Sequence, residues 1–190
     1  MHRVTYSMST SLDGYIVGPD GSFDWSEPDP EVFRGFLDEL RETGVHLMGR
    51  RLYETMLYWD DADPQTLDEQ EQEWARLWRA LPKVVFSTTL TAVEGAGTRL
   101  AGGGIAEEIE RLRAEPGDGD IALGGATLAA EAARLGLIDE YRIRIHPILV
   151  GGGIPFLVYD ERQVRLELVE SRPYGPIVYV RYRVVRGDAA

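Results

Sequence analysis

The chain has 190 residues, of which 44% are hydrophobic and 27% charged, a composition typical of one globular domain with a sizeable core. Its formal net charge of −12 disfavours nucleic-acid and anionic-membrane binding, and no apolar run approaches the roughly 18 residues of a membrane span. Cysteine is absent, which excludes disulfides and thiolate chemistry, and the three histidines lack metal-ligand spacing, so we expect no metal site.

The N-terminal part of the chain is predicted to alternate strands and helices. Its first residues carry no signal-peptide pattern, so we expect a cytoplasmic protein. Pro30 suits the first turn of a helix, and the apolar side chains that follow recur on one helical face. The predicted elements are a strand at 3–9, a loop at 11–26, a helix at 30–43, a strand at 45–48 and a helix at 50–57.

The middle of the chain continues this alternation. Trp74 and Trp78 fall at helical spacing, and we interpret them as core residues rather than as ligand-stacking residues. The predicted elements are a loop at 58–67, a helix at 68–81, a strand at 83–87, a helix at 105–115, a strand at 121–123 and a helix at 126–135.

The last third changes character and favours antiparallel strands. Strands are predicted at 140–146, 163–171 and 177–185, with a hairpin connection at 172–176. The whole pattern predicts an α/β fold in one domain over residues 3–185, with a largely parallel sheet extended by antiparallel strands. Segments 141–145 and 179–182 carry apolar and aromatic side chains that fit either a dimer surface or the core.

A glycine pair lies between the strand at 121–123 and the following helix. Gly124 and Gly125 let backbone N–H groups approach a ligand, and the helix start adds partial positive charge, which favours a nucleotide phosphate. The alternative is an ordinary tight turn. Arg50 and Arg51 supply a local basic patch within the acidic chain.

Six segments in order give the chain a family resemblance. They are Ser11-Leu-Asp-Gly-Tyr-Ile16, Met48-Gly-Arg50, Val85-Phe-Ser-Thr-Thr89, Leu123-Gly-Gly-Ala-Thr127, Leu137-Ile-Asp-Glu-Tyr141 and Pro147-Ile-Leu-Val-Gly-Gly-Gly153. This order resembles the dihydrofolate-reductase-like superfamily, in particular the C-terminal reductase domain of the riboflavin-biosynthesis deaminase-reductase. The resemblance implies a mixed sheet of about eight strands with flanking helices, NADPH as hydride donor and often a homodimer.

The resemblance also implies which residues bind the cofactor. Arg50 would meet the 2′-phosphate or pyrophosphate, since an Arg fork suits phosphate oxygens. The less favoured alternative for Arg50 and Arg51 is a solvated helix start. Ser87 and Thr88 would line the adenosine side, or only cap the strand end. The implied cofactor residues are Ile16 near the nicotinamide, Gly49, Arg50, Arg51, Ser87, Thr88, Gly124, Gly125, Ala126 and Thr127.

The substrate side matches the family less well. Leu123 and Ser7 stand where the riboflavin-pathway reductases commonly have glutamate and lysine, and Phe33 falls at the position of the dihydrofolate reductase carboxylate. Asp29 or Glu31 could replace that carboxylate if the helix is shifted by about one turn. The residues expected beside the substrate are Trp25, Phe33 and Tyr53, and the candidate proton donors are Asp13, Asp29 and Glu31 or a bound water. Asp13 could equally be a turn residue, and Trp25 could only close the core.

Three functions remain open from the sequence. The first is an NADPH-dependent reductase that transfers hydride to a small heterocycle, with the riboflavin-type substrate, 5-amino-6-(5-phosphoribosylamino)uracil, as the default. The second is dihydrofolate reductase activity. The third is a nucleotide-binding module without catalysis.

Overall fold

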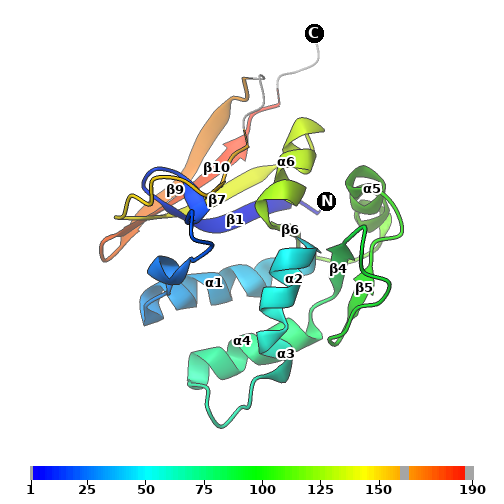
Figure 1. The fold of residues 1–190 in the computed structure, drawn as a ribbon. Coiled ribbons are helices and arrows are strands. Elements are labelled where there is room, and N and C mark those ends of the chain that lie inside the picture. Colours follow the sequence, from blue (N-terminus) through cyan, green and yellow to red (C-terminus); the bar gives the residue numbers. More distant parts are fainter. Residues whose placement is uncertain (1, 159–162, 187–190) are drawn as a thin grey trace.

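The computed structural model describes residues 2–158 and 163–186, which are built around an eight-stranded sheet (Figure 1). The strand order is β5-β4-β3-β6-β1-β7-β10-β9, and a separate two-stranded sheet pairs β2 with β8. The strands are β1 (Val4–Ser11), β2 (Tyr15–Val17), β3 (Thr43–Gly49), β4 (Lys83–Phe86), β5 (Thr98–Leu100), β6 (Asp120–Gly124), β7 (Glu140–His146), β8 (Ile154–Pro155), β9 (Leu166–Tyr174) and β10 (Ile177–Val184).

The sheet is mixed, as the sequence predicts. From β5 to β7 all neighbouring strands are parallel, and β10 and β9 then add antiparallel pairs. The connection from β1 to β3 passes over β6, and the connection from β6 to β7 passes over β1. All six parallel strands therefore end at the same edge of the sheet.

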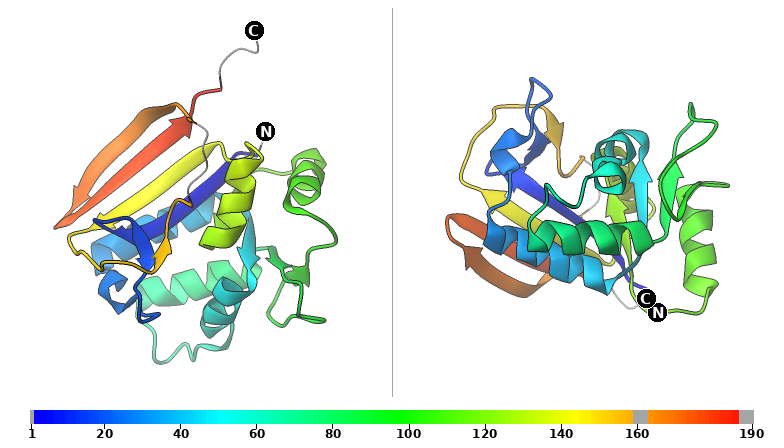
Figure 2. Two further views of the ribbon diagram at one scale, coloured as in Figure 1. Left: turned by 45° about the horizontal axis from the view of Figure 1, so that its top comes forward. Right: turned by 90° about the horizontal axis from the view of Figure 1, so that it is seen from below.

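Helices cover both faces of the sheet (Figure 2). They are η1 (Asp24–Ser26), α1 (Pro30–Glu42), α2 (Arg50–Met56), α3 (Tyr58–Asp61), α4 (Glu69–Ala80), α5 (Ile105–Ala114) and α6 (Ala126–Arg134). Side chains of α5 and α6 pack on one face, and side chains of α1, α2 and α4 pack on the other. Within the described ranges, no helix combines the length and apolar character needed to cross a membrane.

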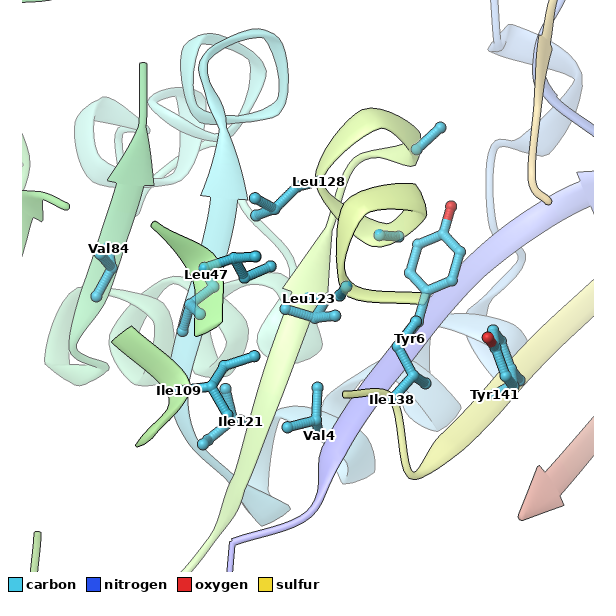
Figure 3. Close-up of a cluster of buried hydrophobic side chains, with 14 of the residues drawn as sticks. Val4, Tyr6, Leu47, Val84, Ile109, Ile121, Leu123, Leu128, Ile138 and Tyr141 are labelled. Atoms are coloured by element: carbon cyan, nitrogen blue, oxygen red, sulfur yellow. The ribbon is translucent and has the colours of Figure 1, made fainter. Parts of the chain in front are cut away.

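The largest core lies between the central strands and the α5–α6 face (Figure 3). Val4, Ile121 and Leu47 come from three adjacent strands, and Ile109 and Leu128 reach them from the two helices. These side chains are almost completely buried, and such burial contributes roughly 1.5–3 kcal/mol each. The short apolar runs of β4 and β6 follow from burial of both faces of a parallel sheet.

Several element boundaries differ from the sequence prediction. The loop predicted at 11–26 contains β2 and η1, and three short elements, α3, β5 and β8, were not predicted. Elements of two to four residues are too short to show a period of 2 or 3.6. The hairpin turn falls at 175–176, because β9 continues to Tyr174. The predicted domain 3–185 includes residues 159–162, which lie outside the described ranges.

Candidate active site

Two helices begin side by side at the carboxyl ends of neighbouring strands. Gly49 is the N-cap of α2 after β3, Gly125 is the N-cap of α6 after β6, and neither N-cap has a side chain to pair with the first N–H groups. A Cβ at either glycine would meet no heavy atom within 4 Å, so the backbone is open there. Gly125 has φ +95°, which glycine adopts without strain. Ala126 and Thr127 then begin α6, and the orphan donors favour an anion.

Gly124 and Gly125 have different structural roles. A Cβ at Gly124 would collide with the side chain of Leu52 and lie 2.7 Å from His46 Cε1. Gly124 therefore allows α2 to pack closely against β6, and Gly125 is the glycine that leaves backbone open.

A basic and hydroxyl-bearing group lies beside the start of α2. Arg50 Nη1 donates to Thr89 Oγ1 at 3.3 Å, and Ser87 Oγ accepts from the backbone N–H of Thr89 and of Leu90 at 3.2 and 3.0 Å. Thr88 and Arg51 are exposed next to them. The structure thus brings Arg50 to the hydroxyls that follow β4. Thr89 was not singled out as a site residue, although the hydroxyl run at 87–89 contains it.

Asp13 ties together two loops at the ends of β1 and β7. Its carboxylate accepts from Gly151 N–H at 2.8 Å and from Val150 N–H at 3.2 Å, and Leu12 N–H donates to Ile148 C=O at 2.8 Å. Hydrogen bonding from Ser11, together with those backbone amides, lowers the pKa of Asp13. These contacts describe a bridge between loops, and a role for Asp13 in proton transfer stays a prediction.

The other predicted catalytic residues lie at the start of α1. Asp29 Oδ1 accepts from Glu31 N–H and Val32 N–H at 2.9 Å each, which makes Asp29 the N-cap of the helix. Glu31 is exposed in the first turn. A catalytic role for Asp29 or Glu31 stays a prediction.

The remaining predicted residues are held by packing. Phe33 lies against Trp59 and Trp74, with ring centroids 6.1 and 5.6 Å apart. Tyr53 is buried, and its hydroxyl accepts from Glu94 N–H at 2.7 Å. Ile16 is a buried residue of β2 within the main core.

A row of polar side chains on β7 was missed by the sequence analysis. Glu140, Arg142, Arg144 and His146 are buried, whereas the alternating Ile143 and Ile145 keep partial exposure. Arg144 pairs with Glu39 of α1 at 2.8 Å, and its guanidinium lies 3.8 Å from the centroid of the Phe36 ring. The signal was the strict alternation of charge in residues 140–146, and only the position of Glu39 shows that the charged row faces inward.

His146 ends that row, beneath the loop that carries Trp25. The two rings meet edge to face, with centroids 5.6 Å apart. Burial, followed by the charge of Arg144, lowers the pKa of His146, and the carboxylate of Asp29 opposes that shift. The structure therefore brings Trp25 to His146, a histidine that the sequence did not indicate. Among the described residues, no group of three or more metal-ligating side chains converges.

With this geometry in place, the family can be identified. The model of the RibD C-terminal domain matches residues 2–180, and the chain belongs to that family, which has the dihydrofolate-reductase-like fold. The resemblance stated from the six sequence segments is confirmed. The family is one of NADPH-dependent reductases.

Individual relatives extend over the whole chain. The uncharacterized protein YyaP of Bacillus subtilis (strain 168) is 31% identical over 174 residues, which are 91% of this chain and 89% of YyaP. A crystallised candidate riboflavin biosynthesis protein from Shewanella sp. PV-4 is 26% identical with a TM-score of 0.79, covering 98% of this chain and 100% of that one. Dihydrofolate reductase from Enterococcus faecalis, in complex with NADP(H), has 15% identity and a TM-score of 0.63, covering 96% of each chain, and shares the fold.

Proposed function

We propose that this protein is an NADPH-dependent reductase that transfers hydride to a small heterocycle. One observation carries the proposal: two helices with open glycine N-caps begin on adjacent strands, next to Arg50 and the hydroxyls at 87–89. Family membership supports the same conclusion. NADPH, when bound, supplies the hydride.

The residues present suit a dinucleotide phosphate. Gly49 and Gly125 leave room for phosphate oxygens against the backbone, and the first N–H groups of α6, from Ala126 and Thr127, lack side-chain partners. Arg50, with Arg51, Ser87 and Thr88, would hold the 2′-phosphate, which favours NADPH over NADH. The NADP(H) complex of the Enterococcus faecalis enzyme supports this assignment. Ile16 would lie near the nicotinamide, and Gly124 would position α2 beneath the cofactor.

The protein's own task is to orient the substrate and to supply a proton. Asp29 caps α1 at the strand end where His146 lies, so we place proton delivery at a water oriented by its carboxylate, or at Asp29 itself when it is protonated. Glu31, two residues after the cap, is the alternative. Asp13 would stay ionised because its pKa is lowered, and it would serve by holding the loops.

The default substrate is the riboflavin-type pyrimidine, 5-amino-6-(5-phosphoribosylamino)uracil, and Trp25 would contact it. The family name and the Shewanella relative support a link to riboflavin biosynthesis. Ser7, which stands at the family lysine, donates to Glu39 at 2.6 Å and so belongs to the buried network under α1. The substrate of this chain would therefore be held by a different set of polar groups.

Dihydrofolate reductase activity is the second candidate, and it needs a carboxylate that binds the pterin. Phe33 packs against two tryptophans at the expected position, and Asp29 is engaged as a helix cap, so the geometry favours it less. A nucleotide-binding module without catalysis is the third candidate. It would bind NADPH and reduce no pterin, pyrimidine or quinone.

We also propose that the protein is a cytoplasmic homodimer. The face of the sheet formed by β7, β10 and β9 carries exposed apolar side chains, among them Leu166, Leu168 and Val178. Contiguous exposed apolar surface of this kind is typical of an interface.

The first experiment is a titration of the pure protein with NADPH and NADH, using Arg50→Ala and the control Arg76→Ala. Loss of charge-assisted hydrogen bonds to phosphate costs about 1.5–3 kcal/mol, so Arg50→Ala should weaken NADPH binding roughly 10- to 100-fold. Arg76 is an exposed arginine of α4, and its removal should leave binding unchanged. Absence of binding by either nucleotide would refute the reductase proposal.

A substrate screen follows, with NADPH oxidation as the readout and pyrimidines, pterins and quinones as substrates. Turnover of a pyrimidine supports the riboflavin-type assignment, and turnover of dihydrofolate alone supports the second candidate. NADPH binding with no turnover would support the third.

A further inference from the structure

Among the described residues, eleven buried side-chain polar atoms lack a hydrogen-bond partner, and five of them belong to residues near one end of the sheet. These five atoms belong to residues at the carboxyl ends of β1 and β7, the loop above them and the β9–β10 hairpin. They are Ser9 Oγ, Trp25 Nε1, Arg144 Nε, His146 Nε2 and Tyr174 Oη. Most buried polar groups in folded proteins form hydrogen bonds, so a cluster of unpaired groups indicates a place where a bound ligand could supply the hydrogen bonds.

The strand register shows that these groups share one face. Ser9 lies opposite Arg144 and Ser11 lies opposite His146 in the β1–β7 pair, so their side chains point to the face covered by α1. Trp25 meets the His146 ring from above, and Tyr174 contacts Tyr179, which lies opposite Arg144. The five residues therefore lie on the side of the sheet that α1 and η1 cover.

The chemistry of this cluster is biased toward donors. The indole N–H of Trp25 and the Nε–H of Arg144 can only donate, the two hydroxyls can donate, and His146 Nε2 can carry a proton. The nearby carboxylates are engaged: Glu39 accepts from Ser7, Arg144 and Tyr179, and Asp29 Oδ1 accepts from two backbone N–H groups. A ligand that satisfies the cluster must therefore supply acceptors.

The segment 19–27, which carries Trp25 and covers His146, forms its hydrogen bonds within itself and with the adjoining Gly18. Among the described residues, the hydrogen bonds of the segment 19–27 run between residues 18 and 27, through Gly18, Asp20, Ser22, Phe23 and Asp24. Trp25 itself is attached to the strands by the edge-to-face contact with His146. Within residues 2–158 and 163–186, no hydrogen bond ties this segment to the sheet, so a displacement of the segment would expose His146 without breaking strand pairing.

We propose that His146, with Trp25 as its movable cover, is the specificity-determining residue of the substrate site and binds a ring carbonyl oxygen of the substrate. This inference rests on the proposed reductase function, because it states the chemistry by which the enzyme would recognise its substrate beside NADPH. Ser9 and Arg144 Nε complete the donor wall around the carbonyl-bearing ring. The wall discriminates against rings that present amino groups instead, because these would leave the donors unpaired.

The test compares pteridine-2,4-dione with 2,4-diaminopteridine in the absence of nucleotide. The second ring has amino groups in place of both carbonyl oxygens and unprotonated nitrogens in place of the two ring N–H groups. The wild-type protein should bind the dione at least about tenfold more tightly, since a mismatch leaves buried donors unpaired. His146→Phe and His146→Gln should both weaken dione binding, with Phe abolishing the preference and Gln, which keeps a donor, retaining part of it. The control His2→Gln, at the other end of β1, should change neither.

A second measurement reads ligand binding in the wild-type protein, and a variant is used only to assign one resonance. In ¹⁵N-labelled wild-type protein, the dione should shift the indole N–H resonance of Trp25, assigned by its loss in Trp25→Phe, more than those of the other three tryptophans. Equal or tighter binding of the diamino ring, an unchanged preference in His146→Phe, or no binding of either ring would overturn the proposal. NADPH titration is read separately, so a failed carbonyl site leaves the cofactor result intact.

Discussion

A glycine can be required by its neighbours or by its ligand, and Gly124 is required by its neighbours. Its missing side chain makes room for Leu52 and for His46 Cε1. We expect Gly124→Ala to lower the free energy of unfolding by about 1–3 kcal/mol, the usual cost of overpacking a core. Gly102→Ala is the control, because a Cβ there meets no atom within 4 Å. Urea unfolding measures both, and equal stability of the two variants would contradict the packing role.

His46, which lies beside Gly124, should make the free energy of unfolding sensitive to acid. Although the residue keeps some exposed surface, its Nδ1 is buried without a partner, and burial, followed by the charge of Lys83, lowers its pKa to about 4. His46 of the unfolded chain therefore takes up a proton near pH 6.5, whereas in the folded protein it stays neutral until the pH approaches 4. The folded protein is therefore most stable with respect to His46 above about pH 6.5, and it loses that stability as the pH falls toward 4.

Between pH 7.5 and 5.5, His46 should account for about 1 kcal/mol of lost stability. Aspartates and glutamates remain mostly ionised over that interval. Unfolding of the wild type and of His46→Gln at both pH values isolates the histidine, because the variant should lose less. An identical loss in both proteins would show that His46 does not titrate in this way.

At the scale of single elements, α1 is the helix on which structure and chemistry overlap. Asp29 caps it, Glu39 pairs with Arg144, and Val32 and Phe36 pack against the β9–β10 hairpin. We expect Asp29→Ala to cost about 1 kcal/mol and Asp29→Asn less than about 0.5 kcal/mol, since asparagine caps as well as aspartate.

The same pair of variants separates the cap from catalysis. If Asp29 delivers the proton, Asp29→Asn should keep its thermal midpoint and lose turnover in the substrate assay. Glu31→Gln removes an exposed charge two residues after Asp29, and this variant should retain both the thermal midpoint and the turnover of the wild type. Turnover by Asp29→Asn at the wild-type rate would exclude Asp29 as proton donor.

The sequence predicted the long elements well because their periodicity spans several turns or strand pairs. Helices such as α4 and strands such as β7 lie within a residue of their predicted bounds. It could not show which side of β7 is buried, because alternation alone does not say which face a partner covers. The burial of Arg144 depends on Glu39 and Phe36, which reach it from a helix more than a hundred residues earlier in the chain.

The cofactor half of the site was therefore easier to predict than the substrate half. Glycines at strand-to-helix junctions and the Met-Gly-Arg turn are local patterns, and the structure places their helix starts side by side. His146, Ser9 and Trp25 come from three separate segments, and their proximity is a property of the strand register and the loop above it.

At the scale of the whole molecule, the β9–β10 hairpin is covered by α1 on one face only. It projects at one edge of the sheet (Figure 1), and Leu168 of β9 is 53% exposed. If this face forms the dimer, Leu168→Glu should shift the protein toward monomer in sedimentation velocity, because a buried unpaired carboxylate is costly. Leu135→Glu makes the same change at an exposed position after α6 and should leave the oligomer intact. A monomeric wild type would refute the dimer.

The continuous sheet also determines how this site can move. Most of the proposed cofactor residues follow β3, β4 and β6, and the proposed carbonyl-binding residues Ser9, Arg144 and His146 lie on β1 and β7 of the same parallel sheet. Two halves of one sheet cannot close on each other like hinged domains, so a closure over bound ligands would fall to the loop segment at 12–29, which contains β2 and η1, and to the loop segment at 147–153. Since the chain contains no cysteine, a single cysteine introduced in the first loop would carry one reporter and follow that movement directly.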